Sequence, residues 1–246
     1  MPIDPKRILY KDDQFLAVHK LSGELSVKGK GAVDKLPLHD FLRKEFPGIR
    51  PVNRLDFETS GVMLFARTRE ALEAVMPPSR KFNAHSLSSR KPPTPLPPSP
   101  DGGGGTEGGE GWKKTYRTVV AGRLTKDHGA IHFPLPARNN KDTVPAHTAY
   151  RVLERYPDCT YIEAEIATGR HHQIRRHFQK IGHPLVLDQI YGDKKFNAAF
   201  SKAHRYRKFF LHAYSVEFVQ PFTKEAVKIN APMPKVFEEL LKKLRG

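Results

Sequence analysis

One aspartate in the first quarter of the chain has the surroundings of a reactive carboxylate. Asp56 follows Arg54 in the run Asn-Arg-Leu-Asp-Phe-Glu-Thr-Ser-Gly at residues 53–61, immediately before the apolar segment 62–66. That apolar segment predicts a buried strand, so Asp56 should stand in a loop at the start of the strand. A carboxylate held beside an arginine stays ionised at neutral pH and can act as a nucleophile or general base. The alternative for this position is an ordinary turn or helix-capping aspartate.

A second group of polar side chains lies far downstream, in the run Thr-Gly-Arg-His-His-Gln-Ile-Arg at residues 168–175. Apolar residues continue from it at the i, i+4 and i+7 spacing of a helix, at Ile174, Phe178 and Ile181. This spacing predicts a helix over 172–181, whose first free N–H groups could help to bind an anion. Arg175 in this helix could pair with a carboxylate or contact an RNA phosphate.

Histidines are frequent in the same part of the chain, at positions 171, 172, 177 and 183. Their separations lack the i, i+4 pair that places two ligands on one helix face, and Cys159 is the only cysteine. We therefore predict no metal site. His172 and His183 are expected to make local hydrogen bonds or to touch a bound polyanion.

The elements that position these residues follow from the apolar patterns. Extended segments are expected at 8–10, 15–18, 62–66, 114–120, 149–153, 161–167, 209–219 and 226–229. Helices are expected at 36–46, at 68–76 with Thr68 as the cap, at 172–181, and from Lys235 with Val236, Leu240, Leu241 and Leu244 buried. The alternation over 161–167 is typical of an antiparallel strand with one buried side. The predicted fold class is α+β, with a central mixed, mostly antiparallel sheet flanked by helices.

A chain of 246 residues can form one large domain. Residues 83–111 interrupt it with a Pro-, Gly- and Ser-rich stretch that has too few apolar residues to offset its ordering entropy, so we predict a disordered insertion. We expect residues 1–246 to form a single catalytic domain around this insertion.

The composition of the chain limits the kinds of partner that it is expected to bind. Lys and Arg number 42 against 26 Asp and Glu, a formal charge of +16, which favours a polyanion such as nucleic acid. No apolar run approaches the roughly 18 residues that a membrane span needs, so no membrane partner is expected. The single cysteine and the lack of a signal-like segment indicate an intracellular, reducing compartment (cytoplasm, nucleus or organelle matrix), not secretion.

Together these runs resemble the signature motifs of the RluA-type pseudouridine synthases, in which an Arg-Leu-Asp carries the catalytic carboxylate. The resemblance also covers the opening run 8–13 with His19, Lys20 and Gly23, the Lys-Thr-Tyr at 114–116, Gly-His-Pro-Leu-Val at 182–186, Leu-His-Ala at 211–213 and Ala-Pro-Met-Pro at 231–234. Each motif alone is weak evidence for the family, but the occurrence of all of them in the family's order is specific. The implied fold is a sheet divided by an RNA-binding cleft, with Asp56 on the cleft floor and no preceding S4-like module.

The resemblance implies roles for single residues. Asp56 would start the isomerisation of a uridine, at the base or at the sugar, after the nucleotide is flipped out of the RNA. Tyr116 would stack on the flipped base and help to remove the C5 proton, and Arg175 would pair with the catalytic carboxylate. RNA contacts are expected from Asn53, Arg54, Lys114, Arg170 and His172. No cofactor is expected, because the reaction is an isomerisation, and the partners would be rRNA or tRNA and ribosomal particles, bound by a monomer.

Three positions depart from the usual family pattern. Asn53 stands where many members have histidine, Leu21 replaces a proline after Lys20, and Leu187 replaces a glycine before Asp188. None of them removes a proposed catalytic group. Two other functions stay open on the sequence: a catalytically idle RNA-binding or ribosome-assembly factor on the same fold, and an unrelated basic phosphoesterase, which would need a metal cluster or activated nucleophile that the sequence does not show.

Overall fold

The computed structural model describes residues 3–28, 36–75, 112–137 and 142–246. The insertion predicted at 83–111 lies outside these residues. In the first half of the chain the elements are the short 3-10 helix η1 (Pro5–Arg7), β1 (Ile8–Lys11), β2 (Phe15–Lys20), α1 (Leu38–Leu42), β3 (Arg50–Pro51), β4 (Ser60–Ala66) and α2 (Arg69–Val75). The second half contributes β5 (Lys113–Ala121), β6 (His128–Ile131), β7 (Leu135–Pro136), β8 (Thr143–Val144), β9 (Thr148–Arg155), β10 (Cys159–Ile166), α4 (Gln173–Lys180), α5 (Lys194–His204), β11 (Leu211–Val219), β12 (Ala226–Asn230) and α6 (Lys235–Arg245).

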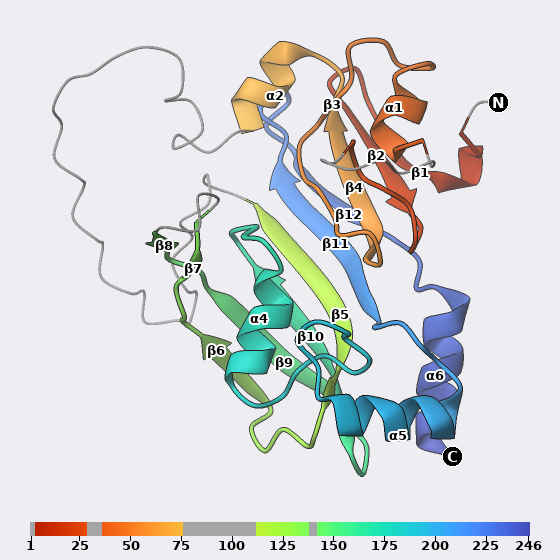
Figure 1. The fold of residues 1–246 in the computed structure, drawn as a ribbon. Coiled ribbons are helices and arrows are strands. Elements are labelled where there is room, and N and C mark those ends of the chain that lie inside the picture. The colour runs from red at the N-terminus through yellow and green to blue at the C-terminus, as the bar shows by residue number, and fades with distance from the viewer. Residues whose placement is uncertain (1–2, 29–35, 76–111, 138–141) are drawn as a thin grey trace, which may run out of the picture.

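A ten-stranded mixed sheet runs through the molecule in the order β1-β2-β4-β11-β5-β10-β9-β6, with β3 paired to β4 and β12 paired to β11 (Figure 1). Neighbours within the N-terminal and C-terminal parts are antiparallel, and the two parts meet at the parallel pair β4 and β11. This confirms the predicted α+β class and its mixed, mostly antiparallel sheet. The cleft dividing the sheet stays a prediction.

The junction between β4 and β11 depends on one glycine. Gly61 has a φ of 118° and pairs with Ala213, and a Cβ built at Gly61 would overlap the Ala213 backbone. Any larger residue would therefore force the two strands apart. Because Asp56 lies in the loop just before β4, this close approach also sets where that loop lies relative to β11.

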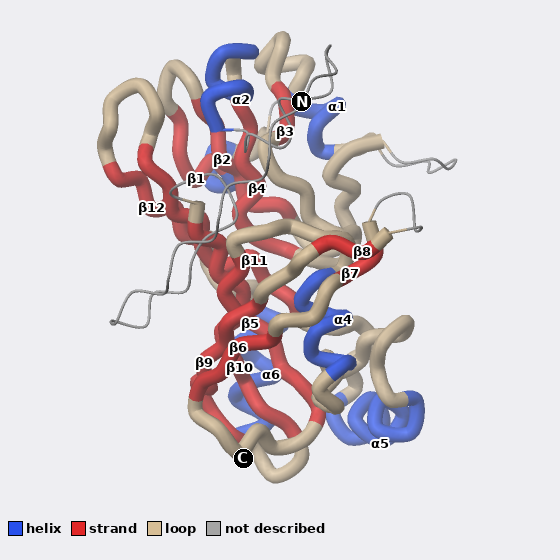
Figure 2. Tube along the Cα trace, turned by 90° about the vertical axis from the view of Figure 1, so that its left-hand side faces the viewer, coloured by secondary structure: helices blue, strands red, loops and turns tan. Residues whose placement is uncertain are grey.

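Helices cover both faces of the sheet (Figure 2). On one face, α1 and α4 pack on the largest apolar cluster, which includes Ile162, Ala164 and Ile166, the residues predicted to share a side of β10. On the other face, α2 packs on a cluster around Phe15 and Leu64, and α6 packs on one around Tyr161, to which Phe200 of α5 also contributes. The elements of the sheet are thus held by buried apolar surface on both sides.

The predicted elements are largely confirmed, with two corrections. The helix expected at 36–46 spans only Leu38–Leu42. In α6, Val236 was predicted to be buried, but its exposed fraction is 47%, whereas Phe237 is only 1% exposed and packs against Tyr161. The larger side chain takes the core position because it buries more apolar area. The sequence patterns also did not reveal α5 or the short strands β3 and β6–β8.

Candidate active site

The loop that carries Asp56 is held from inside by a buried lysine. Lys20, the last residue of β2, is fully buried, and its Nζ donates hydrogen bonds to the carbonyl oxygens of Leu21, Asp56, Phe57 and Thr59 at 2.7–3.1 Å. Burial lowers the pKa of Lys20 to about 8, although the nearby carboxylates of Glu24 and Asp56 oppose this shift. The side chain therefore remains an ammonium group at neutral pH, where it can fasten the loop to the end of β2.

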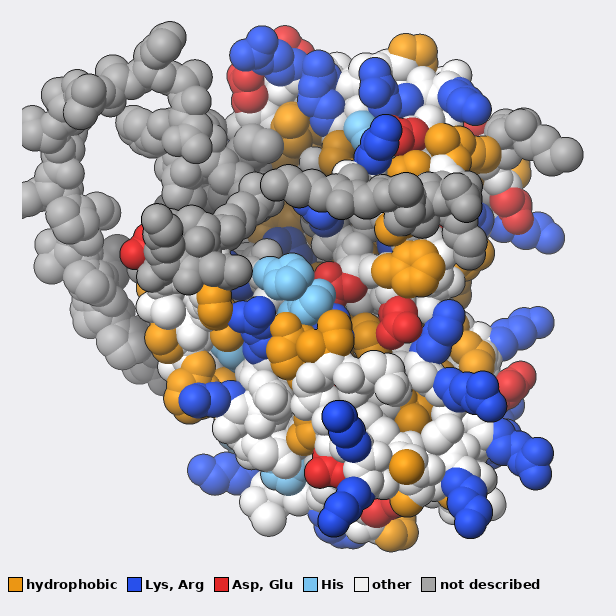
Figure 3. All heavy atoms as spheres, viewed as in Figure 1, with side chains coloured by type: hydrophobic (Ala, Val, Ile, Leu, Met, Phe, Trp, Pro, Cys, Tyr) orange, Lys and Arg blue, Asp and Glu red, His pale blue; other side chains and the backbone are white. Residues whose placement is uncertain are grey.

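The Asp56 carboxylate meets two residues of the second polar run. Its Oδ2 lies 3.6 Å from Nη1 of Arg175 and 3.6 Å from Nε2 of His172. The Asp56 side chain is 33% exposed, so one side of the carboxylate remains open to a ligand. Figure 3 shows histidine side chains next to carboxylates in the middle of this face of the molecule, with hydrophobic and basic side chains around them.

Arg175 has a closer partner than Asp56. Its Nε and Nη2 donate to the two carboxylate oxygens of Asp188 at 2.6 and 2.9 Å, and the two side chains are 5% and 0% exposed. Burial alone would raise the pKa of Asp188, but the hydrogen bonds from Arg175 and from the N–H groups of Tyr191 and Ile190 outweigh it and hold the pKa below its ordinary value. This bidentate pair fixes the guanidinium plane, which leaves Nη1 directed at Asp56.

Aromatic rings enclose the Arg175 guanidinium. Its centre lies 4.6 Å from the ring centroid of Phe209 and 5.0 Å from that of Tyr191. A charge held between aromatic faces and a carboxylate has little freedom to change its rotamer. The positive charge beside Asp56 is therefore fixed in place before any ligand binds.

His172 stands in an unusual backbone conformation at the start of α4. Its φ of 54° lies in the left-handed region, its Nδ1 is 3.1 Å from the Tyr191 hydroxyl, and its ring stacks on His171 at 3.7 Å. Burial lowers the pKa of His172 to about 4, a shift that Asp56 opposes and Arg175 reinforces. His172 is therefore neutral at pH 7 and lies beside Asp56 as an uncharged polar ring rather than as a cation.

Tyr116 lies on β5, buried within the cluster under α1 and α4. Burial raises the pKa of Tyr116, and the negative charge of Asp56 raises it further. The phenol is therefore neutral at ordinary pH. A neutral tyrosine can stack on a base and hydrogen-bond through its hydroxyl group, but it is not a strong base.

Besides His172, four residues are predicted to contact RNA, and they have different surroundings. The side chains of Arg54 and Arg170 are exposed. Lys114 Nζ lies 5.9 Å from the Trp112 ring centroid and close to Gly169, so it stands beside the turn before α4. The Asn53 amide accepts a hydrogen bond from Leu64 N–H at 2.7 Å and donates one to Val62 at 3.3 Å. The Asn53 amide thus joins its loop to β4.

Sequence reasoning missed two residues of this site, Lys20 as the loop clamp and Asp188 as the main partner of Arg175. For Lys20 the available signal was a charged residue that ends an apolar strand. Asp188 offered a weaker signal, since it follows Leu187, which stands where the family has glycine. Leu187 has a φ of 65°, a conformation that glycine adopts without strain, and this explains the usual residue there.

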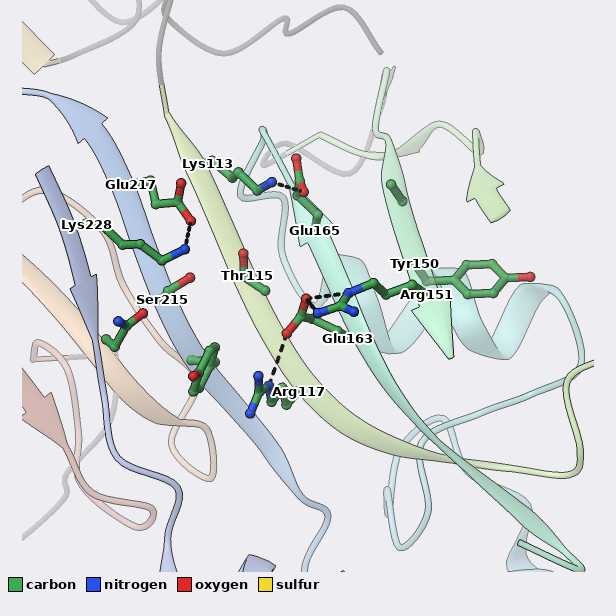
Figure 4. Close-up of a pocket in the computed structure, with 13 residues that line it drawn as sticks. Lys113, Thr115, Arg117, Tyr150, Arg151, Glu163, Glu165, Ser215, Glu217 and Lys228 are labelled. Carbon is green, nitrogen blue, oxygen red and sulfur yellow. Dashed lines mark hydrogen bonds and ion pairs between the residues drawn. The ribbon is translucent and has the colours of Figure 1, made fainter. Parts of the chain in front are cut away.

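The opposite face of the sheet carries a polar groove of about 550 Å³ between β9, β10, β5, β11 and β12 (Figure 4). Its carboxylates are each paired with cations at 2.8–3.1 Å: Glu165 with Lys113, Glu217 with Lys228, and Glu163 with Arg117 and Arg151. These charges compensate one another, which is typical of a solvated sheet face. Within the described ranges, no group of three or more His, Cys, Asp or Glu could hold a metal ion, and no helix could cross a membrane.

Comparisons with known proteins show which family this chain is similar to. The family model described as RNA pseudouridylate synthase matches residues 14–85 and 108–180. The ribosomal large subunit pseudouridine synthase C of Vibrio vulnificus (strain CMCP6) is 32% identical over 242 residues, which cover 97% of this chain and 69% of that protein. The protein of the same name from Escherichia coli (strain K12) is 31% identical over 254 residues, which cover 97% and 70%.

Two solved human structures share the fold. Human RNA Pseudouridylate Synthase Domain Containing 4 superposes with a TM-score of 0.70 at 20% identity, over 98% of this chain and 93% of that chain. Human RNA Pseudouridylate Synthase Domain Containing 1 gives a TM-score of 0.64 at 20% identity, over 100% and 98%. The match to the family model, together with relatives above 30% identity over most of their length, shows that the chain belongs to the RNA pseudouridylate synthase family.

Proposed function

We propose that this protein converts a uridine of RNA to pseudouridine and that Asp56 is the reacting carboxylate. One observation carries the proposal: a partly open Asp56 carboxylate lies 3.6 Å from Arg175, whose guanidinium is locked by Asp188. A guanidinium that is fixed beside a carboxylate holds that carboxylate in one orientation. The carboxylate is therefore ready to act as nucleophile or base without a metal to activate it.

The proposed reaction is an isomerisation, so uridine and pseudouridine contain the same atoms. The glycosidic bond from N1 to C1′ of the ribose breaks, the uracil turns within the site, and a bond forms from C5 to C1′. The proton on C5 leaves, and N1 gains a proton, so that atoms and electrons balance. Asp56 can begin this sequence by attack on the sugar carbon or on the base ring, and both routes use the same carboxylate.

The other site residues support that carboxylate. Arg175 orients the Asp56 carboxylate, and neutral His172 limits how far that carboxylate can turn. Tyr116 supplies the surface on which the detached uracil stacks while it rotates. Because burial raises the pKa of Tyr116, its hydroxyl keeps its proton and can hydrogen-bond to the uracil ring. The proton on C5 is therefore expected to be accepted by solvent or by Asp56.

RNA reaches this site only if the target nucleotide leaves its helix, at a cost of a few kcal/mol. In this proposal the exposed side chains of Arg54 and Arg170, and Lys114 beside the turn before α4, bind phosphates that flank the flipped nucleotide. The names of the two bacterial relatives support ribosomal RNA of the large subunit, free or within ribosomal particles, as the first target to test. We further propose that the chain is a single catalytic domain that acts as a monomer.

The test is pseudouridine mapping by carbodiimide and primer extension on total RNA incubated with wild-type protein or with Asp56→Asn. The asparagine keeps the shape of the side chain but removes its charge, so we expect a discrete stop with wild-type protein and none with the variant. Glu217→Gln on the opposite sheet face is the matched control and should retain the stop. RNA affinity should be similar in all three proteins, because it depends on Lys and Arg.

Normal turnover by Asp56→Asn would disprove the assignment of Asp56. No stop on any RNA with wild-type protein, while RNA binding remains tight, would instead favour the catalytically idle assembly factor.

A further inference from the structure

A second cavity opens next to the Asp56 loop. It has a volume of about 340 Å³ and lies between the loop, the segment that joins α5 to β11, and the start of α6. Glu58 and Ser60, which follow Asp56 in the chain, form part of its lining. A cavity of this size is within the range of small-ligand sites.

The wall of this cavity is mainly aromatic. Tyr206, Phe209, Phe210 and Phe237 line it, and Val236 stands beside them with 47% of its surface exposed. Tyr206 and Phe210 meet edge to face with centroids 5.3 Å apart, and both are only half-buried. Ring surface that is packed on one side and open on the other is suited to stacking with a planar group.

Cations surround the same cavity. Arg205, Arg207 and Lys208 line it with exposed side chains, and none of the three has an ion pair within the described part of the chain. This differs from the groove on the opposite face, where each carboxylate is already paired with a cation. Unpaired cations next to an aromatic slot are the usual combination for a nucleotide, because the base stacks while the phosphates meet the charges.

The cavity is directly coupled to the proposed catalytic site. Phe209 lines the cavity and also lies 4.6 Å from the centre of the Arg175 guanidinium. Ser60 lines the cavity as well, and its Oγ is 2.9 Å from Nδ1 of His212 at the β4–β11 junction. A group bound in the cavity therefore rests against the residues that hold the Asp56 loop and Arg175 in place.

We propose that this cavity holds a second, unstacked base of the RNA, close in the chain to the target uridine. The base stacks on the Phe210 ring and meets the nearly perpendicular Tyr206 ring at its edge. Its N–H edge donates to Glu58, and its flanking phosphates contact Arg205, Arg207 and Lys208. The inference rests on the proposed function for the nature of the ligand. It adds a specificity site, because the target uridine must then have a neighbour that can leave its own stack.

Photo-crosslinking tests the location without any need for turnover. A decauridylate with 4-thiouridine at each position is irradiated with wild-type protein, and the crosslinked peptides are identified by mass spectrometry. We expect crosslinks within residues 206–210 in addition to those near Tyr116. The same crosslinks should form with Asp56→Asn, in which isomerisation is lost. Failure of this inference can therefore be distinguished from failure of the proposed function. Crosslinks confined to the surroundings of Asp56 and Tyr116 would overturn the inference.

Filling the cavity tests its role. Val236→Trp adds an indole to a half-exposed position, so the fold should be retained, which is checked by thermal melting. We expect about tenfold weaker binding of fluorescein-labelled decauridylate, within the range for loss of one stacked base. On the RNA identified by mapping, KM should rise by about the same factor with kcat within twofold, since the base is bound in both ground and transition state.

The cationic rim is tested with Lys208→Ala, matched by Lys228→Ala on the opposite sheet face, which removes the same charge. Lys208→Ala should weaken decauridylate binding several-fold and lower its salt dependence by about one counterion, whereas Lys228→Ala should change neither by as much. Equal effects of the two variants, or unchanged RNA affinity in Val236→Trp, would overturn the proposal and point to another occupant, such as a protein segment.

Discussion

Arg175 is placed by groups that do not themselves react. Two N–H groups of Arg175 donate to the Asp188 carboxylate, and the rings of Phe209 and Tyr191 enclose the guanidinium plane. Only Nη1 is therefore directed at Asp56. A free arginine would pair with the nearest carboxylate as closely as it could. Here the tighter pair with Asp188 keeps Arg175 3.6 Å from Asp56, which leaves the Asp56 carboxylate, proposed to react, only partly engaged.

Asp188→Asn should disturb both stability and catalysis. The change leaves a buried arginine without its main counter-charge, and breaking a buried ion pair in this way costs about 3–5 kcal/mol of unfolding free energy. The guanidinium should also move towards Asp56 and tie up its carboxylate, so kcat should fall while RNA affinity is unchanged. Urea unfolding and single-turnover isomerisation measure the two effects.

Glu217→Gln, which loosens an exposed pair with Lys228, is the control and should stay within about 1 kcal/mol of wild type. A fully active and stable Asp188→Asn protein would show that Asp188 does not position Arg175.

At the scale of elements, the loop that carries Asp56 depends on the strand next to it. β2 ends at Lys20, and the ammonium group reaches across to four carbonyl oxygens, three of them in the loop that precedes β4. Because β2 and β4 are antiparallel neighbours, the end of one strand lies beside the start of the other. A long cationic side chain at that end can therefore hold the loop that carries Asp56 in a single conformation.

Lys20→Met should free this loop. Methionine fills similar space but leaves buried carbonyl oxygens without a donor, which should lower the unfolding free energy by about 2–3 kcal/mol. We expect kcat to fall more than RNA affinity, because Asp56 is no longer held in position. Wild-type turnover should also decline above about pH 8, where Lys20 loses its proton, and this alkaline decline should be absent in the variant. An alkaline decline of equal size in both proteins would assign it to another group.

Over the whole molecule, several buried histidines make the fold sensitive to acid. Burial lowers the pKa of His172 and of His212 to about 4, whereas an unfolded histidine titrates near 6.5. Between these values the unfolded chain binds protons that the folded chain does not, so acid favours unfolding. The contribution of these histidines to the unfolding free energy is complete above pH 6.5. It is lost progressively as the pH falls towards 4.

The unfolding free energy should therefore fall on the order of a few kcal/mol between pH 6.5 and pH 4. Urea unfolding at half-unit pH steps measures this slope. His212→Gln should reduce the slope, since it removes one fully buried imidazole, whereas His128→Gln at an exposed position of β6 serves as the control. A slope that is the same in wild type and His212→Gln would exclude His212 as a contributor.

The sequence by itself determined the parts of this protein that are coded locally. The period-two and helical patterns predicted most strands and helices, because each pattern reflects the one face of an element that must be buried. Asp56 and Arg175 sit in short runs whose residue types already suggest chemistry, whereas Tyr116 was predicted only through the family resemblance, and the catalytic roles of all three stay predictions. The tertiary structure then brought Asp56 and Arg175 together.

Only the tertiary structure decided which groups support those residues. Asp188 became the main partner of Arg175, Lys20 became the clamp of the Asp56 loop, and Phe237 rather than Val236 entered the core. The aromatic cavity beside the loop likewise draws its wall from segments distant in the chain. The physical reason is that a charge or a ring takes its role from the groups packed around it, and those neighbours are set by how strands and helices meet in space rather than by their spacing along the chain.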